Sequence, residues 1–155
     1  MKRIAPTILG TLLAASVTTA LGAPQGQMEV YVKRSKIEVI DIGAPGPSVG
    51  DISITTGPIS KTNGGEPIGN YVTRRITMVV NQPGKTEADV MQELRLPEGT
   101  ILVSSILSLT ALAPTPEREQ VRAIIGGTGK YAGARGESML RVLDSDTRLI
   151  TFHFE

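Results

Sequence analysis

The glycine-rich stretch Ile124–Glu137 is the part of the chain whose residue types most directly suggest chemistry. It holds five glycines within eleven residues, and Gly127–Ala132 satisfies the G-x-G-x-x-[GA] pattern of a dinucleotide-binding turn. That turn must open a helix, yet Gly133 and Gly136 would each destabilise the helix by about 1 kcal/mol relative to alanine. Apolar and polar residues alternate afterwards, and too few residues remain for a second nucleotide-binding half. The sequence therefore predicts a connection between strands here, not a nucleotide site.

Two adjacent arginines, Arg74 and Arg75, are the second candidate. Neighbouring residues of a strand point to opposite faces, so one of the two points inward if this strand lines a barrel. A buried guanidinium needs a carboxylate partner or a bound anion. Two interpretations stay open: the inward arginine pairs with Glu93 or Glu137 at a wet barrel mouth, or it recognises a carboxylate or phenolate of a ligand.

The strand around these arginines supplies further polar groups for a ligand. Tyr71, Thr73 and Arg75 share one face of it, and Arg74 lies on the other face together with apolar residues. Because both faces are mixed, alternation alone does not decide which one points inward. We therefore keep all four residues as candidate ligand-binding residues.

Metal and nucleophile chemistry find little support. His153 is the only histidine and cysteine is absent, so the usual zinc ligand sets cannot form, and no G-x-S-x-G elbow is present. Asp51 is expected to hydrogen-bond to its own turn, and Asp144 and Asp146 are expected to be turn residues. We expect no metal and no cofactor, and the sequence names no catalytic residue.

Composition and charge place the chain among single-domain proteins. The 155 residues suffice for one core without disulfides. Residues 1–22 are typical of a secretory signal peptide, with Lys2 and Arg3 before a short apolar run, and residues 23–155 form the mature domain. Removing the leader leaves 14 basic and 15 acidic residues, a net charge of −1. With the two signs interleaved and few aromatics, nucleic-acid binding is not expected. We expect a secreted or periplasmic protein without a membrane span in its mature form.

The mature sequence predicts strands and no long helix. Turn residues separate eight segments with two-residue alternation or continuous apolar character. These segments are 28–42, 51–56, 71–80, 89–96, 100–113, 117–125, 134–143 and 148–154. Segment 28–42 shifts phase as a bent strand would, and segment 100–113 is apolar enough to be buried on both faces. Eight strands without a covering helix favour an all-β, eight-stranded antiparallel barrel, lipocalin-like in shape.

Two motifs resemble those of the allene oxide cyclase and dirigent proteins, which share one barrel fold. The late one is the string G-G-T-G-K-Y-A-G-A-R-G-E within Ile124–Glu137. The early landmarks are Gly50-Asp51, Gly57-Pro58-Ile59, Gly65 and Ile68-Gly69. The resemblance spans about residues 49–155. It implies an allene oxide cyclase-like barrel, a homotrimer, and a position near the ligand pocket for Arg135, the arginine of the late motif.

The resemblance also implies a function, with departures from the plant proteins. In this family a lumenal ligand is shaped for cyclisation or radical coupling by preorganisation. Gly57 stands where the cyclases carry a water-holding asparagine, and Thr55-Thr56-Gly57 stand where dirigents carry an acidic pair. We therefore expect a secreted barrel that binds a small hydrophobic molecule and steers its cyclisation or coupling. The sequence leaves open whether it is an enzyme; if it is one, an isomerase-like or cyclase-like activity is expected.

Two other functions stay open. A non-catalytic carrier or scavenger of hydrophobic metabolites would use the same lumen, and a structural protein would fill it with its own side chains. An inward acid, arginine and tyrosine meeting at one point would favour the enzyme, whereas an entirely apolar lumen would favour the carrier.

Overall fold

The computed structural model describes residues 22–82, 85–110 and 119–155. The expected signal peptide, residues 1–22, lies outside this range except for its last residue. The predicted domain, residues 23–155, is represented by most of its length.

Strands make up almost all of the regular structure in these ranges. The elements are β1 (Gly26–Lys33), β2 (Lys36–Ile40), β3 (Ile52–Ser60), β4 (Pro67–Gln82), β5 (Lys85–Leu96), β6 (Gly99–Thr110), β7 (Gln120–Gly127), the 3-10 turn η1 (Gly129–Tyr131), β8 (Gly136–Val142) and β9 (Thr147–Phe154). Within the described ranges, strands are found in each of the eight segments expected from the sequence, with boundaries shifted by a few residues. Residues 117–118 of the expected segment 117–125 lie outside those ranges.

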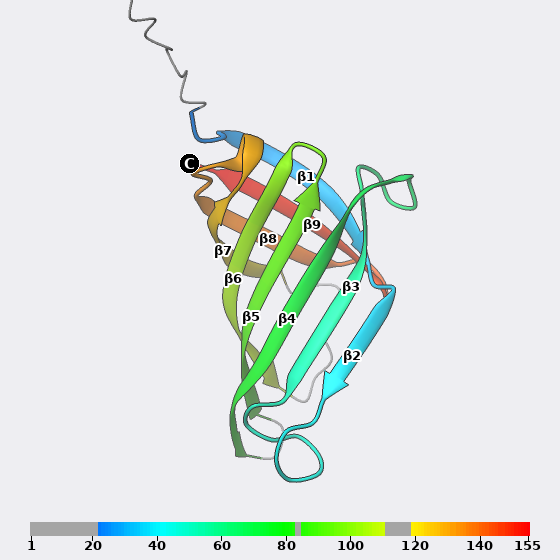
Figure 1. Cartoon of the computed structure of the whole chain (residues 1–155), viewed down its shortest axis with the longest axis vertical. Helices are drawn as coiled ribbons and strands as arrows, with labels where there is room; N and C mark the ends of the chain where they lie inside the picture. Colours follow the sequence, from blue (N-terminus) through cyan, green and yellow to red (C-terminus); the bar gives the residue numbers. More distant parts are fainter. Residues whose placement is uncertain (1–21, 83–84, 111–118) are drawn as a thin grey trace, which may run out of the picture.

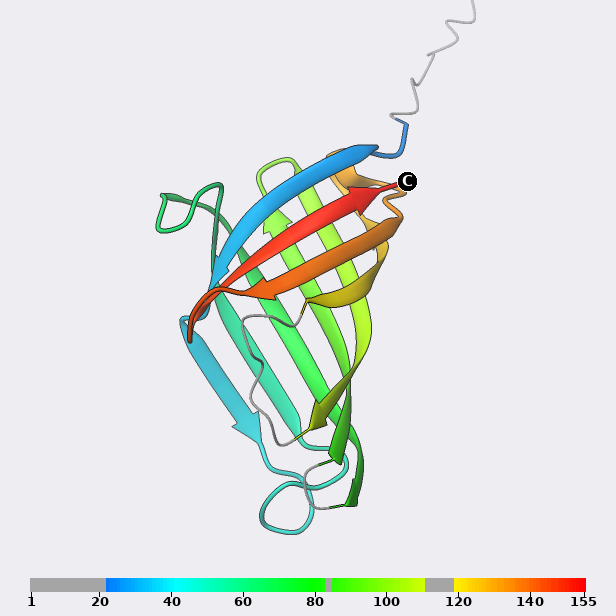
Figure 2. The ribbon, with the colours of Figure 1, turned by 180° about the vertical axis from the view of Figure 1, so that it is seen from behind.

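The strands form one antiparallel sheet that closes on itself. Their order is β1-β9-β8-β7-β6-β5-β4-β3-β2, and β1 also pairs with β3. In Figure 1, β3 to β6 lie in front and β1, β8 and β9 cross behind them; Figure 2 shows the same barrel from behind. The prediction of an all-β, eight-stranded antiparallel barrel is confirmed, with β1 and β3–β9 as the closed ring.

β2 accounts for the ninth strand. It follows β1 after Arg34 and Ser35 and continues along the other half of β3, from Lys36 opposite Thr56 to Ile40 opposite Ile52. The expected bent strand over residues 28–42 is thus β1 and β2 together. Its bend matches the phase shift in the sequence.

Gly57 is the residue that lets the barrel close. A Cβ atom at this position would overlap the backbone carbonyl oxygen of Lys33. Next to it, the Ser35 backbone N–H donates to the Thr56 carbonyl oxygen over 2.9 Å. A glycine allows such a close approach of two backbones, so the early motif has an architectural role in this chain.

The glycine-rich stretch is the connection from β7 through η1 to β8. The Lys130 backbone N–H donates to the Glu98 carbonyl oxygen over 2.8 Å, and the Lys130 ammonium pairs with the Glu98 carboxylate at 3.0 Å. Gly129 has a positive φ of 59° and lies so close to the β5–β6 turn that a Cβ would overlap the same carbonyl. The stretch opens no α-helix, in agreement with the predicted strand connection.

The interior is apolar at the end of the barrel that carries η1 and the C-terminus. Tyr131, Phe154 and Phe152 stack there, with ring centroids 6.1 and 5.8 Å apart in that order. The remaining buried members of this cluster are Val30, Val32, Ile59, Tyr71, Leu94, Ile101, Val103, Ile124, Ala134 and Ile150.

The expectation that residues 100–113 are buried on both faces is wrong for the described part. Ile101 and Val103 are buried, but Ile106 on the other face of β6 is 62 % exposed. Among the described residues no second layer covers the outer wall of the barrel, so one face of β6 is open to solvent there. Residues 111–113 lie outside the described ranges.

Candidate functional site

The inward face of β4 is the face with the tyrosine. Tyr71 lies opposite Leu94, and Arg75 opposite Val90. Tyr71, Leu94 and Val90 are all buried. Since paired residues point to the same side of a sheet, Tyr71, Thr73 and Arg75 project into the barrel. The structure thus decides what alternation left open.

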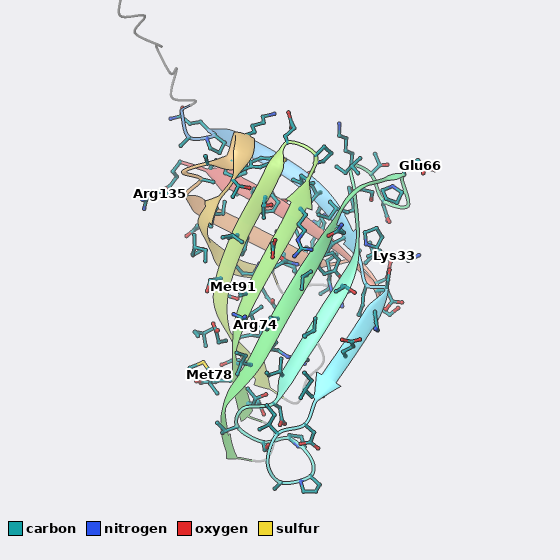
Figure 3. The ribbon with its side chains drawn as sticks, in the orientation of Figure 1. Lys33, Glu66, Arg74, Met78, Met91 and Arg135 are labelled. Carbon is teal, nitrogen blue, oxygen red and sulfur yellow. The ribbon has the colours of Figure 1, made fainter. Side chains whose placement is uncertain are left out.

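Arg74 and Arg135 do not point into the lumen. Figure 3 looks onto the outer wall, where Arg74 lies beside Met91, its Nη2 atom 3.9 Å from the Met91 sulfur. Arg135 is exposed on the outside just before β8, and its carbonyl oxygen accepts a hydrogen bond from the Glu155 backbone N–H over 3.1 Å. Of the five candidate ligand-binding residues, the structure brings three together on the inner wall.

A chain of hydrogen bonds crosses the inner wall from β4 to β7. The Gln92 side-chain amide donates to the Thr73 hydroxyl over 3.0 Å. Arg122 Nη1 donates to the Gln92 side-chain oxygen over 2.6 Å. Arg122 and Gln92 are 5 % and 3 % exposed, so Thr73 is one end of a buried polar row.

Arg122 is the principal inward residue that the sequence analysis missed. It sits on β7 opposite Ser138 of β8. Arg122 Nε and Nη2 and the Ser138 hydroxyl oxygen are buried and make no hydrogen bond within the described structure. Burial lowers the pKa of Arg122 from its ordinary value to about 10, because a low-dielectric surrounding disfavours the charged form. The guanidinium is therefore still charged at neutral pH.

The pattern of β7 gave no signal for this residue. Val121 and Ile125 are apolar and exposed, whereas Arg122 on the opposite face is buried. Ordinary alternation would place the Val121 face inside. Only the pairing with neighbouring strands identifies Arg122 as inward.

The lumen carries positive charge. Besides Arg75 and Arg122, Arg148 also points inward, opposite Val32 and Val142, which are both buried. Among the strand residues whose side chains the structure describes, no aspartate or glutamate shares the inward face. An interior of this kind favours an anionic partner electrostatically.

Tyr71 lies near the Arg148 end of this interior. Burial raises the pKa of the Tyr71 phenol, and the charges of Arg148 and Arg34 act in the opposite direction. Arg34 is itself paired with Asp146, with its Nη2 atom 2.6 Å from the carboxylate. At neutral pH Tyr71 therefore offers a neutral hydroxyl that can donate or accept a hydrogen bond.

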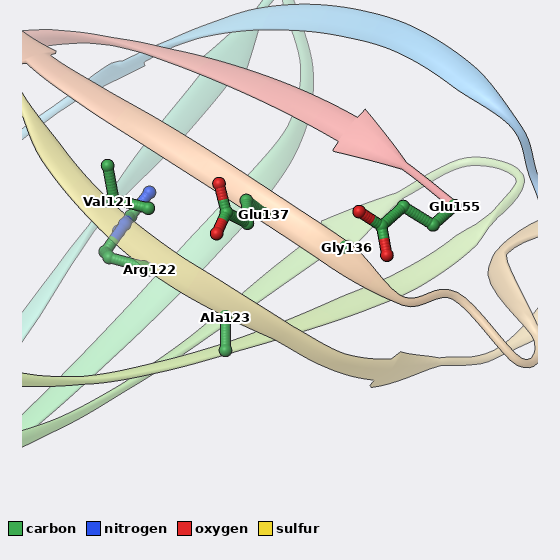
Figure 4. A pocket seen from close by; sticks show the side chains of 6 residues that line it. All are labelled: Val121, Arg122, Ala123, Gly136, Glu137 and Glu155. Atoms are coloured by element: carbon green, nitrogen blue, oxygen red, sulfur yellow. The ribbon is translucent and has the colours of Figure 1, made fainter.

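A separate hollow lies on the outer wall over β7 and β8. It encloses about 320 Å³ and is lined by Val121, Arg122, Ala123, Gly136, Glu137 and Glu155. Figure 4 shows the Glu137 and Glu155 carboxylates on the near side, whereas the Arg122 side chain extends to the far side of the sheet. This hollow is thus acidic and distinct from the lumen.

Other polar residues have structural roles. The Asp51 carboxylate accepts hydrogen bonds from the backbone N–H groups of Ile42 and Ser48 over 2.9 and 2.7 Å, which tie the loop before β3. His153 is exposed on the outer side of β9.

Within the described ranges, no group of three or more histidines or acids is placed to hold a metal ion. No helix in those ranges is long and apolar enough to cross a membrane.

Comparison with known proteins agrees with this geometry. The sequence matches the family described as "Allene oxide cyclase barrel like domain" over residues 28–153. No curated protein sequence matches the chain.

Solved structures with the same barrel have varied activities. A pyocyanin demethylase superposes with a TM-score of 0.67 at 25 % identity, covering 84 % of this chain and 100 % of its own. AbnU, an exo-specific intermolecular Diels-Alderase, superposes with a TM-score of 0.56 at 16 % identity. The match covers 82 % of this chain and 99 % of AbnU. The Diels-Alderase AbmU from Streptomyces koyangensis superposes with a TM-score of 0.61 at 16 % identity. The match covers 83 % of this chain and 63 % of AbmU. The two Diels-Alderases establish similarity of fold.

Proposed function

This chain belongs to the allene oxide cyclase barrel like family, and we propose that it binds a small, largely apolar molecule in its lumen and steers that molecule's cyclisation or coupling. One observation carries the proposal. At the η1 end, inward side chains such as Leu94, Ile101 and Phe152 are fully buried. Farther along the barrel, Thr73, Arg75 and Ser105 point inward and remain half-buried. The lumen is filled at one end and keeps accessible polar groups farther along.

The chemistry proposed is preorganisation. Holding a flexible apolar molecule in one folded conformation removes part of the entropic barrier to ring closure or coupling. Hydrogen bonds from Tyr71, Thr73 and Arg75 would fix the orientation of the ligand. The demethylase and Diels-Alderase neighbours are named for reactions of small organic molecules, which supports a reactive rather than a purely structural barrel.

A non-catalytic carrier remains the second candidate. An arginine and a tyrosine point inward, but no acid does so among the described strand positions. The inner wall therefore lacks the acid–arginine–tyrosine group expected of an enzyme, and it is not entirely apolar, as expected of a carrier. Turnover of the bound molecule separates the two functions. A carrier returns its ligand unchanged, and an enzyme returns an isomer or a coupled product.

Export and assembly belong to the same proposal. The charged start and apolar run of residues 1–22 support a signal peptide, so the protein is proposed to be secreted or periplasmic. A homotrimer is proposed because apolar side chains lie exposed on the outer wall. These are Met78, Ile106, Val121 and Ile125. Light scattering on the exported protein should give three times the mass of one chain; a monomer at all concentrations would contradict this.

The test of the proposed function is native mass spectrometry of protein exported by its own host. A small organic mass bound to each subunit, released by organic solvent, is the expected result. Incubating the stripped protein with that molecule then shows whether it is converted. A protein that carries no such mass, and does not bind the apolar dye N-phenyl-1-naphthylamine, would refute lumenal binding.

A further inference from the structure

The guanidinium of Arg122 has one edge engaged and one edge without a hydrogen-bond partner among the described residues. Nη1 is bonded to Gln92, whereas Nε and Nη2 are buried without a partner within the described structure. Nε–H and Nη2–H point in parallel from the same side of the guanidinium, which is the fork that binds both oxygens of a carboxylate. The unpaired hydroxyl of Ser138 lies at the opposite position of the adjacent strand.

The same protein shows how this edge is used elsewhere. Arg95 Nε and Nη2 bind the two carboxylate oxygens of Glu93 over 2.8 and 3.2 Å. Arg34 Nε and Nη2 bind Asp146 over 3.0 and 2.6 Å. In both pairs the Nε–Nη2 edge contacts a carboxylate. Arg122 presents this edge inside the barrel, where the described strands supply no acid.

An unpaired buried cation is costly. Removing a charge from water without a partner is strongly unfavourable. A buried unsatisfied group in a folded protein therefore calls for an ion, a water or a ligand. Because Arg122 is 5 % exposed and hydrogen-bonded through Gln92 to Thr73, its guanidinium is held in place instead of swinging into solvent. Besides the polar Gln92 and Ser138, the inner wall near Arg122 carries apolar residues: Ile124 on the same strand face and Phe152 opposite Ser138 are both buried.

We propose that the Nε–Nη2 edge of Arg122, together with the Ser138 hydroxyl, binds the carboxylate of an otherwise apolar lumenal ligand. The proposal rests on the proposed function and narrows its ligand class to apolar carboxylic acids, such as fatty-acid derivatives or aromatic acids. The carboxylate would neutralise the buried cation, and the apolar remainder would lie toward Thr73 and Arg75. The anchored acid would then set which part of the ligand reaches the polar groups of β4.

A pair of isosteric probes tests the proposal. N-phenyl-1-naphthylamine, which is neutral, reports on apolar binding by its fluorescence. It is displaced by 1-naphthoate or by 1-naphthamide, which differ in charge and hardly in shape. The naphthoate should displace the dye at a concentration about ten- to a hundredfold lower than the amide, as expected for a charge-assisted, bidentate contact. Equal potency of the two would overturn the proposal.

Variants locate the effect. In Arg122→Met the preference for naphthoate should disappear while the dye still binds, and in Arg122→Lys it should be only partly retained because an ammonium lacks the fork. Arg141→Met serves as the matched control, because Arg141 is exposed on the outer face of β8, and it should keep the full preference. A naphthoate preference that survives in Arg122→Met would place the anion elsewhere and refute the assignment.

Ser138→Ala covers the case in which the arginine variants do not fold. It removes a hydroxyl that has no partner within the described residues, so folding should be preserved, and naphthoate affinity should fall about threefold while amide affinity is unchanged. An unchanged naphthoate affinity would exclude the hydroxyl from the site. Repeating the titrations in chloride and in sulfate buffers tests whether a small inorganic anion occupies the site. If the preference for naphthoate over naphthamide is lost in chloride alone, the site binds a halide, and the assignment to an organic carboxylate is wrong.

The outcomes separate this inference from the proposed function. Failure of the dye to bind wild-type protein would count against lumenal binding altogether. Dye binding without a preference for naphthoate would leave lumenal binding intact and refute only the carboxylate anchor.

Discussion

Arg122 and Ser138 lie opposite each other in the β7–β8 ladder, both point into the barrel, and both carry buried polar atoms without a hydrogen-bond partner in the described structure. The Arg122 guanidinium and the Ser138 hydroxyl are thus both removed from water at adjacent positions of the inner wall, which is unfavourable for each of them. A ligand oxyanion placed between them would satisfy both.

The unliganded protein should lose little stability when this charge is removed. We expect Arg122→Met to change the free energy of unfolding by less than about 1 kcal/mol, or to raise it, because replacing buried ionic groups by apolar ones is often neutral or stabilising. Urea denaturation of stripped protein measures this. A loss of about 3 kcal/mol or more would mean that Arg122 has a further strong partner in the folded protein besides Gln92.

The two neighbouring arginines of β4 provide a matched pair for ligand binding. Arg75→Glu places a negative charge on the inner wall and should lower 1-naphthoate affinity about tenfold by Coulomb repulsion. Arg74→Glu makes the same change on the outer wall and should alter the affinity less than about twofold. Calorimetric titration of both variants checks this; similar losses in the two would indicate binding outside the lumen.

Gly57 should be intolerant of any side chain. Gly57→Ala would force Cβ into the Lys33 carbonyl oxygen and separate β1 from β3, so we expect a loss of about 3 kcal/mol or more in the free energy of unfolding. Gly64→Ala is the control: Gly64 has a φ of 71° with open space around it, and only about 1 kcal/mol should be lost. Thermal and urea denaturation of the two variants measure this. Equal losses in the free energy of unfolding would contradict the prediction.

The Asp51 carboxylate should make stability depend on pH at the acid end. Backbone hydrogen bonds from Ile42 and Ser48 hold its pKa below the ordinary value of 3.8, so the unfolded chain binds a proton at higher pH than the folded one. This contribution is fully present above pH 3.8 and is lost as the pH falls through the folded-state pKa.

Asp51→Asn, which cannot ionise, isolates that contribution. Melting temperatures measured from pH 7 to pH 2 should fall less steeply below pH 3.8 in the variant than in the wild type. Parallel curves would show that the Asp51 hydrogen bonds do not distinguish the ionised from the protonated carboxyl.

Much of the fold followed from local sequence. Two-residue alternation in segments such as 71–80 and 148–154, with glycine, proline and aspartate between them, determined the strands, because side chains of a strand alternate between faces whatever the tertiary context. The glycine-rich stretch Ile124–Glu137 also determined a strand connection, since repeated glycines disfavour a helix.

The orientation of the faces was decided only by the tertiary structure. On β4 both faces mix arginine with other polar and apolar residues, and on β7 the more apolar face, with Val121 and Ile125, is the one outside. Pairing of Arg75 with Val90 and of Arg122 with Ser138 around a closed ring fixed which side faces the lumen. Closure is a long-range property, set where Gly57 meets Lys33, so no local pattern could reveal that a buried arginine lies inside the barrel.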